Sequence, residues 1–565
     1  MTRPFPTDEQ INAINEAVTP DALEHMALSG MFCQEISAGG KAAQMLVYLP
    51  EKLPHGCCSV FVLMPAGCGA EAFLEKAGWI VLADREKFAV LGLELPEGAE
   101  DALELATAAR DTMLDRKYYN LGKTLVYVAA YGAAAKTAEQ LILKSPSKLA
   151  GLAVMGQGGC SAAELRALGK APSLVKSVKM SEVACPLSIF TDKLSAENRA
   201  AINFFIKTNK LERSPYRRDG MRYYMPDRIY DDNWVNSENT APVAVMVKKD
   251  LDVCSPQVTE RAWAELSKYF RPLDYRNTST HPRRTPSQWG LERREMAVDG
   301  WKRSWEEFVP AGYKKSRSRR FPLVIDLHGG SGTPSLELGQ GSWVRTAKAR
   351  DLFLAVPHGS LRLFTNGTLT HPAWNANGKS SKQDDIKFIK LLIEDMCSRF
   401  PIDRTRIYIT GHSMGSAMTQ QLILEMPEVF AAAASNGGVI RPGFFGGFAR
   451  GEGKTAKIPV IIQLGQFDRG GGTFKENPDA LKTVEYWIKR NDAGNVNKPA
   501  EYVNGPFRHK VYHNAEGVPM VHFITTTDKD HLVTPQDALM YYDEFLSKYS
   551  RQPDGTVCYM GTPVK

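Results

Sequence analysis

Ser413 stands in a pattern that could turn its hydroxyl into a nucleophile. Residues 411–415 read Gly-His-Ser-Met-Gly, so one glycine lies two positions before the serine and another lies two positions after it. A serine at the tip of a sharp strand-to-helix turn has a strained backbone, and glycines at these positions avoid collisions with the strand and the helix. The pattern predicts a nucleophile, and an ordinary crossover turn that contains a serine is the alternative.

The candidate base is His531. A serine nucleophile needs a base within hydrogen-bond reach, and in a doubly wound sheet the base follows both the serine and the acid along the chain. His531 lies in a loop beyond the strand-like stretch 521–526. His522 falls inside that stretch and is expected to be structural, while His509 and His513 precede it and are expected at the surface.

The candidate acid that would orient this histidine is Asp468. Residues 458–465 are mostly apolar, which is the pattern of a buried strand, and Asp468 follows them in a loop. Such loops, at the carboxyl ends of parallel strands, carry the sites of doubly wound sheets, and a turn aspartate is the alternative. Asp528 and Asp530 could replace it, but they are nearly adjacent to His531 and less able to reach its far ring nitrogen.

Two backbone N–H groups must point at one place to stabilise an oxyanion. Met414 supplies one of them, as the residue after the nucleophile. We expect the other from the loop 328–332, His-Gly-Gly-Ser-Gly, which follows the strand-like stretch 323–327. Gly330 is our first choice because a glycine lets the backbone approach a substrate oxygen closely, and a glycine turn needed only for packing is the alternative.

Three further side chains, His328, His412 and Trp374, are expected to contact the substrate. Trp374 could line an acyl or aromatic pocket, or it could serve packing alone. The metal-binding pattern H-E-x-x-H is absent and the histidines are dispersed, so we expect no metal. Residues 156–159 lack the spacing of a dinucleotide fingerprint, and we expect no cofactor.

Strand-like and helix-like stretches alternate along the chain. Strand patterns such as 59–64, 126–129 and 323–327 each lead into a turn of small residues and then a helical pattern. Alternation of this kind argues for a parallel sheet with helices on both faces. The predicted fold class is α/β, with mostly parallel, doubly wound sheets.

The alternation of strand-like and helix-like stretches occurs twice along the chain. Residues 126–146 align without a gap to residues 407–427, at an offset of 407 − 126 = 281. A repeat of this length indicates two similar domains rather than a solenoid. At that offset Gly132 lies under Ser413. Residues 64–69 align separately with residues 327–332, which places Pro65 under His328. Ser255-Pro256 aligns with Thr534-Pro535, at an offset of 535 − 256 = 279, which places Asp252 under His531. The first copy is therefore predicted to hold the fold without the reaction.

The length of 565 residues also requires more than one domain. We predict a non-catalytic domain over residues 1–274, a polar, Pro-rich linker over 275–294 and a catalytic domain over 295–565. The first domain could be a docking platform, a wall over the pocket of the second, or a dimerisation surface. The last of these alternatives would make the protein a homo-oligomer, so the sequence leaves the oligomeric state open.

Composition excludes several classes of protein. A hydrophobic content of 43% and a charged content of 24% are those of a globular protein. The net charge of +7 is small for this length, and the densest basic run, residues 314–320, has no nucleic-acid motif beside it, so we expect no nucleic-acid partner. No run of about 18 apolar residues occurs, so we expect no membrane partner.

Location is predicted from the cysteines and the N-terminus. The nine cysteines are scattered and odd in number, which favours reduced thiols in a cytoplasm. The first residues have no apolar signal segment. We expect a cytoplasmic protein, although a chain already trimmed of its signal peptide would look the same and would be secreted.

Several short motifs resemble one known family. They are the segments 309–313 (Val-Pro-Ala-Gly-Tyr), 327–330 (Leu-His-Gly-Gly), 373–375 (Ala-Trp-Asn), 384–385 (Asp-Asp), 401–403 (Pro-Ile-Asp) and 408–415 (Tyr-Ile-Thr-Gly-His-Ser-Met-Gly). Through them, residues 295–550 resemble the polyhydroxybutyrate depolymerase and feruloyl esterase family of α/β-hydrolases. Residues 40–270 resemble the same fold more faintly, without its catalytic residues.

The resemblance implies two tandem α/β-hydrolase-like domains and a carboxylic-ester hydrolase that uses Ser413, Asp468 and His531. The substrate would be a small-molecule or oligomeric ester, of the hydroxyalkanoate or hydroxycinnamate type. The chain departs from the family at Leu464-Gly465, where His-Gly is usual, and after His531, where the Gly-His-x-Trp-Pro pattern is missing. A serine peptidase, a thioesterase and a non-enzymatic binding protein are the alternatives.

Overall fold

The computed structural model divides into two compact units. The first comprises Met1–Val18, Glu24–Arg283 and Phe364–Leu369, and the second comprises Thr19–Leu23, Arg284–Leu363 and Thr370–Lys565. The structure describes residues 2–565 apart from residues 98, 116, 145–147, 173–178, 227–239, 272–279, 316–317, 342, 442–447 and 532.

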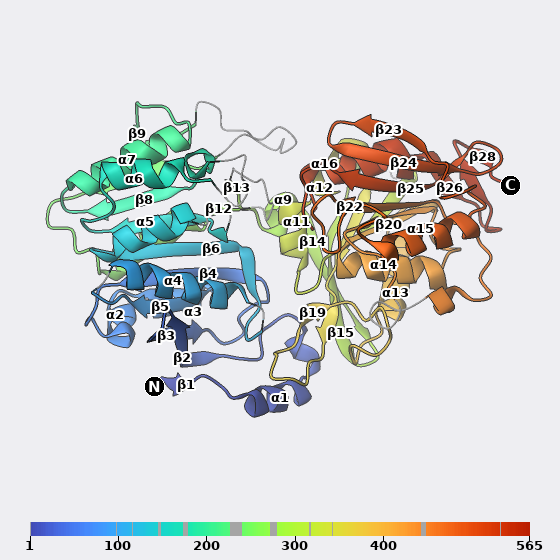
Figure 1. Cartoon of the computed structure of the whole chain (residues 1–565). Helices are drawn as coiled ribbons and strands as arrows, with labels where there is room; N and C mark the ends of the chain where they lie inside the picture. Colours follow the sequence, from blue (N-terminus) through green and yellow to red (C-terminus); the bar gives the residue numbers. More distant parts are fainter. Residues whose placement is uncertain are drawn as a thin grey trace. The chain divides into compact units, whose positions relative to one another are not determined.

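The second unit is built on a ten-stranded sheet (Figure 1). Its central strands are parallel, and the outer pairs at each edge are antiparallel. In spatial order the strands are β14 (Leu291–Val298), β15 (Trp301–Phe308), β17 (Phe353–Pro357), β16 (Phe321–Leu327), β20 (Ile402–His412), β21 (Ala432–Asn436), β22 (Val460–Gly465), β25 (Pro519–Thr526), β24 (Phe507–His513) and β23 (Ala500–Asn504).

Helices connect these strands and cover the sheet. They are α9 (Pro286–Trp289), α10 (Ala311–Lys315), α11 (Pro334–Gln340), α12 (Trp343–Arg350), α13 (Asp385–Arg399), α14 (Met414–Glu425), α15 (Pro478–Arg490) and α16 (Pro535–Met540). Small additions are the hairpin of β18 (Ser360–Arg362) with β19 (His371–Ala373) and a C-terminal sheet of β26 (Tyr549–Arg551), β27 (Val557–Tyr559) and β28 (Thr562–Pro563).

The first unit is built on an eleven-stranded sheet. In spatial order its strands are β1 (Arg3–Pro4), β2 (Gly30–Ala38), β3 (Lys41–Leu49), β5 (Ala89–Glu94), β4 (Cys57–Met64), β6 (Leu121–Tyr131), β7 (Gly151–Met155), β8 (Leu187–Thr191), β11 (Val243–Val247), β10 (Met221–Tyr224) and β9 (Tyr216–Arg218). A short pair, β12 (Tyr269–Phe270) with β13 (His281–Pro282), lies outside it.

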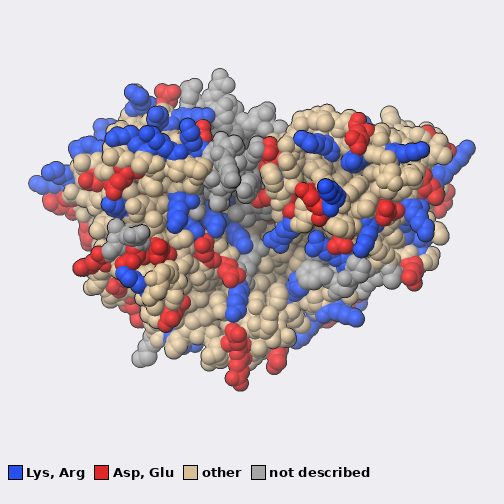
Figure 2. Space-filling model, viewed as in Figure 1, with Lys and Arg blue, Asp and Glu red and all other residues tan. Residues whose placement is uncertain are grey.

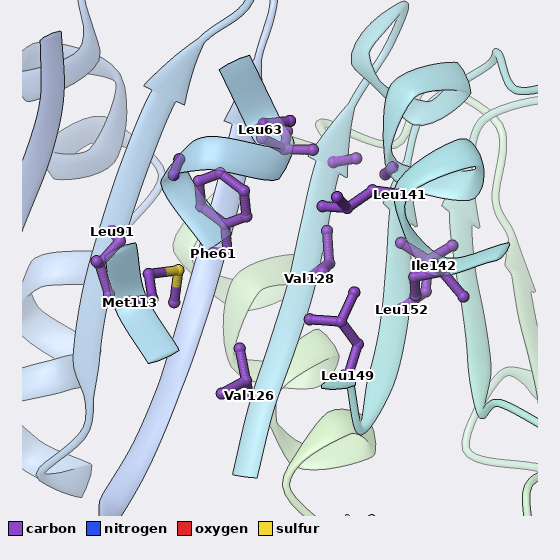
Figure 3. Packing of buried hydrophobic residues seen from close by; sticks show 14 of the residues in the cluster. Phe61, Leu63, Leu91, Met113, Val126, Val128, Leu141, Ile142, Leu149 and Leu152 are labelled. Carbon is purple, nitrogen blue, oxygen red and sulfur yellow. The ribbon is translucent and has the colours of Figure 1, made fainter. Parts of the chain in front are cut away.

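The helices of the first unit lie between its strands along the chain. They are α1 (Asp8–Glu16), α2 (Ala70–Lys76), α3 (Trp79–Glu86), α4 (Ala99–Leu114), α5 (Ala134–Lys144), α6 (Ala162–Lys170), α7 (Ala196–Thr208) and α8 (Pro256–Leu266). Figure 3 shows part of the core, to which Phe61 of β4, Val128 of β6, and Leu141 and Ile142 of α5 belong. Strands β4 and β7 are buried along their whole length, which is typical of central strands covered on both faces.

From β2 and β14 onward, the two sheets have the same strand order and the same pairing directions. Even a register irregularity recurs, between Cys57 and Ser59 of β4 and between Phe321 and Leu323 of β16. Strands β6 and β20 begin and end at positions that differ by the predicted offset, since 402 − 121 = 281 and 412 − 131 = 281. The chain therefore contains two sheet-bearing units of one topology.

The units do not follow the predicted domain limits at every point. Residues 286–289 form α9 and residues 291–294 begin β14, although both fall in the predicted linker, and residues 272–279 of that linker lie outside the described part. The segment Phe364–Leu369 belongs to the first unit, where the Asn15 side chain donates hydrogen bonds of 2.7 Å to the carbonyl oxygens of Phe364 and Thr368. Nothing in the local sequence signals that assignment.

Basic and acidic side chains are mixed over the face drawn in Figure 2. Basic residues gather on the β9–β10 hairpin, which carries Arg217, Arg218 and Arg222. Strand β9 is an edge of the first sheet, and charged side chains on an edge strand hinder pairing with another chain. Among the described helices, none combines the length and the apolar character that crossing a bilayer requires.

Candidate active site

Ser413 occupies a strained turn between β20 and α14. Its φ is +53°, in the left-handed region that side chains other than glycine avoid. A Cβ on Gly411 would collide with the carbonyl of Gly415, and a Cβ on Gly415 would collide with the carbonyl oxygens of Leu327 and His328. Glycine is therefore required at both positions, as the sequence predicts: at 411 because the start of α14 lies against the end of β20, and at 415 because the end of β16 and the start of the following loop lie against the helix.

The three residues predicted to act together meet at this turn. The His531 Nε2 lies 2.7 Å from the Ser413 Oγ, and the His531 Nδ1 lies 2.6 Å from the Asp468 Oδ1. Because the carboxylate can only accept, Nδ1 carries the hydrogen of that bond and Nε2 is left to accept from the serine hydroxyl. Asp468 follows β22 and His531 follows β25, the neighbouring parallel strand.

Asp468 is held as a buried carboxylate. Its side chain is 2% exposed, and burial alone would raise its pKa. The hydrogen bond from His531, the positive charges of His531 and Lys529 and the Arg469 N–H outweigh burial, so the pKa of Asp468 is lowered. The Arg469 N–H donates to its Oδ1 at 2.6 Å. The carboxylate can therefore stabilise an imidazolium without taking its proton.

The predicted oxyanion donors lie side by side. Met414 is the first residue of α14, so its N–H has no partner inside the helix and points along the positive end of the helix dipole. A Cβ on Gly330 would come within 2.7 Å of the Met414 sulfur, and a Cβ on Gly329 would come within 3.4 Å of the Ser413 Cβ. Glycine at both positions lets the loop close over the serine.

His328 holds the oxyanion loop from within. It is 1% exposed, its Nδ1 lies 2.7 Å from the Gly329 carbonyl oxygen, and its Nε2 accepts the Gly359 N–H at 2.9 Å. Burial lowers the pKa of His328 to about 3, which keeps the ring neutral, with its hydrogen on Nδ1. Both ring nitrogens are occupied by the protein, so the structure places His328 in the support of the loop.

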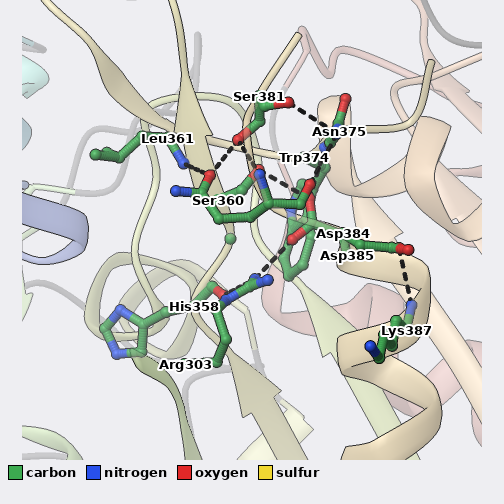
Figure 4. A network of polar contacts seen from close by, with 12 residues as sticks. Arg303, His358, Ser360, Leu361, Trp374, Asn375, Ser381, Asp384, Asp385 and Lys387 are labelled. Atoms are coloured by element: carbon green, nitrogen blue, oxygen red, sulfur yellow. Dashed lines mark hydrogen bonds and ion pairs between the residues drawn. The ribbon is translucent and has the colours of Figure 1, made fainter. Parts of the chain in front are cut away.

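Trp374 is also part of that support. It is 1% exposed, and its indole N–H donates to the His328 carbonyl oxygen at 2.7 Å. Figure 4 shows the polar network around it, in which Asp385 accepts from Arg303 at 2.6 Å and from the Asn375 N–H at 2.6 Å. The motif residues Trp374, Asn375 and Asp385 thus fix the loops that border the site.

His412 lies directly before the nucleophile. It is 7% exposed, and its Nε2 lies 2.6 Å from the His531 carbonyl oxygen, to which the neutral ring donates. Burial, followed by the nearby His531, lowers the pKa of His412 to about 3. The side chain therefore ties the base-bearing loop to β20.

The other histidines considered as bases lie away from the serine hydroxyl. His522 is buried within β25, with its ring 4.6 Å from the ring of Phe545. His509 was expected at the surface, yet it is 2% exposed and stacks on Tyr502 at 4.2 Å. That expectation was wrong: His509 lies on β24, and Tyr502 of the paired strand β23 covers its ring. The local sequence does not show this strand pairing.

Sequence reasoning missed a layer of buried polar side chains beneath the turn. The Ser413 N–H donates to the Asn436 carbonyl oxygen at 2.8 Å. The Asn436 side chain in turn contacts Lys529, Asp537 and Tyr541. A signal was present: Asn436 and Gln463 are polar residues at the ends of apolar strands, where the aligned residues of the first copy, Met155 and Phe190, are apolar. A small cavity beside this layer is lined by Asp326, Glu337, Thr410, Asn436, Asp537 and Tyr541 among others.

The described residues include no cluster of three or more His, Cys, Asp or Glu side chains arranged to bind a metal ion.

A mostly parallel sheet with this strand order, Ser413 at a strained turn after β20, and Asp468 and His531 after β22 and β25 are the arrangement of the α/β-hydrolase fold. The profile of the Prolyl oligopeptidase family matches residues 367–447.

Poly(3-hydroxyalkanoate) depolymerase C of Paucimonas lemoignei is 28% identical over 253 residues, which are 40% of this chain and 58% of the relative. Feruloyl esterase B of Piromyces equi is 32% identical over 127 residues, 22% of each chain. The matches thus span about half of the first relative and about a fifth of the second.

Solved structures are similar at low identity. An acetyl xylan esterase from Aspergillus awamori is 15% identical, with a TM-score of 0.33, over 45% of this chain and 99% of that one. An S-formylglutathione hydrolase from Agrobacterium tumefaciens is 16% identical, with a TM-score of 0.33, over 46% and 93%.

Proposed function

We propose that the second unit is a serine carboxylic-ester hydrolase that works through an acyl-enzyme. The observation that carries the proposal is the chain of two hydrogen bonds, 2.7 and 2.6 Å, that links Ser413 to His531 and His531 to Asp468. These residues lie up to 118 positions apart in the chain, and local structure alone does not bring them together.

The reaction has two steps. The Ser413 Oγ attacks the ester carbonyl carbon while its proton passes to the His531 Nε2, and the carbonyl oxygen becomes an oxyanion facing the N–H groups of Met414 and Gly330. Each such donor is typically worth about 3 kcal/mol of transition-state stabilisation. The imidazolium then protonates the departing alcohol. Water, deprotonated by the same imidazole, releases the acid and restores the serine.

Substrate class is proposed from the relatives. A hydroxyalkanoate oligoester or a hydroxycinnamate ester fits the names that the similar proteins carry, a depolymerase of poly(3-hydroxyalkanoate) and a feruloyl esterase. His328, His412 and Trp374 are buried and hydrogen-bonded to the protein, so we assign them to the support of the site. Substrate selection would then fall to other residues around the turn.

A serine peptidase is the second candidate, because the matching family profile is that of prolyl oligopeptidases. The same triad serves amides, and the difference lies in how well the departing nitrogen is protonated and bound. Thioesters are a third class that this chemistry accommodates.

The test combines labelling with a substrate panel. A serine-reactive fluorophosphonate should label the wild-type chain at Ser413 and leave Ser413→Ala unlabelled. Nitrophenyl esters, hydroxycinnamate esters, hydroxybutyrate oligomers, thioesters and prolyl peptides then rank the substrate classes by kcat/KM. Turnover that survives unchanged in a folded Ser413→Ala variant contradicts the proposal, and a panel led by peptides favours the peptidase.

The first unit is proposed to be a non-catalytic copy. Its turn carries Gly132 where the second unit carries Ser413, and its counterpart of His531 is Asp252, an exposed residue that accepts the Cys254 N–H. The described residues of this unit thus offer neither a nucleophile nor an imidazole at the turn.

A further inference from the structure

Lys529 is a buried cation that the reaction does not use. It is 2% exposed and lies two residues before His531. Its Nζ donates to the Asn436 Oδ1 at 2.9 Å and lies 4.0 Å from the Asp537 Oδ2. An ammonium group is buried only when it is paired, because removing it from water costs free energy that few contacts return.

Lys529 touches all three segments that carry the triad. Its side chain bonds Asn436, whose carbonyl oxygen accepts the Ser413 N–H at 2.8 Å. Its backbone carbonyl accepts the N–H of Phe467, the residue before Asp468, at 2.9 Å. Its own loop presents His531. A single residue is thus tied to the nucleophile, the acid and the base.

The counter-ion of Lys529 is fixed from several sides. Asp537 accepts from the Asn436 side chain at 3.0 Å, from the Gln463 side chain at 2.8 Å and from the Thr534 N–H at 2.6 Å. Tyr541 donates to Gln463 and lies 2.8 Å from the Asn436 Nδ2. Acceptance on both carboxylate oxygens is typical of an ionised group, and a fully connected network of this kind holds its members in one arrangement.

The first unit shows that the fold does not need this layer. Aligned positions of the two units differ by 281 in the region of Asn436 and by 279 after β25. Met155 of the first unit therefore corresponds to Asn436 (436 − 281 = 155), and Val258 corresponds to Asp537 (537 − 279 = 258). Strand pairing places Phe190 at Gln463, because Met155 pairs with Phe190 as Asn436 pairs with Gln463. Ala262 corresponds to Tyr541, and the exposed Asp250 corresponds to Lys529. Apart from Asp250, the corresponding residues are buried and apolar: Met155, Phe190, Val258 and Ala262. The polar layer accompanies the triad and is absent where the triad is absent.

We propose that Lys529, paired with Asp537, is a positioning residue that sets the distances within the Ser413–His531–Asp468 triad. The inference rests on the proposed ester hydrolase function.

The charged and titratable groups around the triad include Lys529. His412 from β20 and Asp468 from the loop after β22 contact His531, and Lys529 lies two residues before it. The positive charge of Lys529 contributes to lowering the pKa of Asp468 and of His412. Burial raises the pKa of Asp326, which lines the cavity beside the polar layer.

The experiment compares three variants in the full-length chain. Lys529→Met removes the cation, Lys529→Met with Asp537→Val restores neutrality with the residue found in the first unit, and Arg399→Met is the matched control. Arg399 pairs with the buried Glu307 at 2.5 Å. Arg399 lies before the start of β20, and Ser413 lies after its end. The eleven residues of this strand span about 30 Å, so Arg399 is far from the site.

We expect Lys529→Met to lower both the denaturation midpoint and kcat/KM, the latter by about 100-fold, since small misplacements of reacting groups have effects of that size. The double variant removes the unpaired carboxylate but leaves the donors of Asn436 and Gln463 without it, so it should regain only part of the midpoint. Its kcat/KM should remain at least about 10-fold below wild type. Arg399→Met should lower the denaturation midpoint without a matching loss in kcat/KM.

A double variant that regains wild-type kcat/KM together with its stability overturns the proposal and makes the pair purely structural. If the wild-type chain neither hydrolyses esters nor reacts with the fluorophosphonate, the proposed function fails. Hydrogen exchange over residues 526–531 still decides the positioning role, because Lys529→Met must loosen that segment more than Arg399→Met does.

Discussion

The turn after β6 and the turn after β20 are two versions of one backbone structure. Gly132 and Ser413 both have φ at +53°, and each N–H donates at 2.8 Å to the last residue of the next strand, Met155 and Asn436 respectively. The elbow conformation is thus a property of the fold and persists without a nucleophile. Strain appears only where a serine replaces the glycine, and it is retained where the site can use it.

The glycines around the two turns differ in an instructive way. The positions of Gly411 and Gly415 hold Ala130 and Ala134 in the first unit, since 411 − 281 = 130 and 415 − 281 = 134. The first unit thus accommodates a Cβ at both positions. In the second unit a Cβ on Gly411 would meet the Gly415 carbonyl, and a Cβ on Gly415 would meet the carbonyl oxygens of Leu327 and His328, where the loop 328–332 begins.

The largest expected effect comes from making the second turn like the first. Ser413→Gly should lower kcat by about 10⁴- to 10⁶-fold, because the nucleophile is gone and only binding and the oxyanion donors remain. Its melting temperature should stay the same or rise, since glycine adopts φ +53° without strain. Steady-state kinetics and thermal melts measure the two effects. Adding Gly132→Ser should restore nothing, and a double variant that turns over esters would show that the first unit is catalytic.

The second largest effect is expected for Asp468→Asn. Its kcat should fall by about 10⁴-fold, because an amide favours the wrong imidazole tautomer. The lowered pKa of Asp468 also makes it a source of stability above the pKa of the unfolded chain, and that stability is lost as the pH falls through the folded value. Urea denaturation at a series of acidic pH values should show a shallower loss in the variant than in wild type. An identical acid dependence in both proteins would contradict this linkage.

Gly415→Ala tests the closing loop. Its Cβ would meet the Leu327 and His328 carbonyl oxygens, so we expect a loss of about 2–3 kcal/mol in the free energy of unfolding and a lower kcat as the loop is displaced. The control is Ala134→Gly at the equivalent position of the first unit, which should cost only about 1 kcal/mol of helix propensity. Equal losses at both sites would remove the distinction drawn between the two turns.

Glu139 offers the smallest effect and the opposite sign of pH dependence. Burial raises its pKa to about 8 from the ordinary 4.5, and its aligned residue in the second unit is Gln420, since 139 + 281 = 420. The folded state keeps a proton that the unfolded chain loses, so stability of the first unit should fall as the pH rises from about 4.5 to about 8. Glu139→Gln keeps an acceptor for the Cys160 N–H and should add about 1–2 kcal/mol at the upper end.

Denaturation of the wild-type chain and of Glu139→Gln across that pH range measures the slope, and activity provides the control. The variant should leave kcat/KM of the second unit unchanged. A slope that persists in Glu139→Gln would assign it to another group.

Much of the site followed from neighbouring residues in the chain. The pattern around Ser413 predicted the strand, the turn and the helix, which the structure gives as β20 and α14. Positions after apolar stretches predicted where Asp468 and His531 would lie, because the carboxyl ends of parallel strands share one edge. The α/β fold class was confirmed by the two sheets. These features depend on local periodicity and on a topology rule, and both can be read without coordinates.

Other features depend on which strands become neighbours and on what their ends then bury. Asn436, Gln463, Lys529, Asp537 and Tyr541 are scattered over about 100 residues, and none belongs to a motif. They meet because β21, β22 and β25 are adjacent and α16 packs on their ends. His328 and His412 were expected to contact the substrate, whereas in the structure both are buried and hydrogen-bonded to the protein. The exposure of a side chain depends on the parts of the chain that fold over it, and the local sequence does not show these.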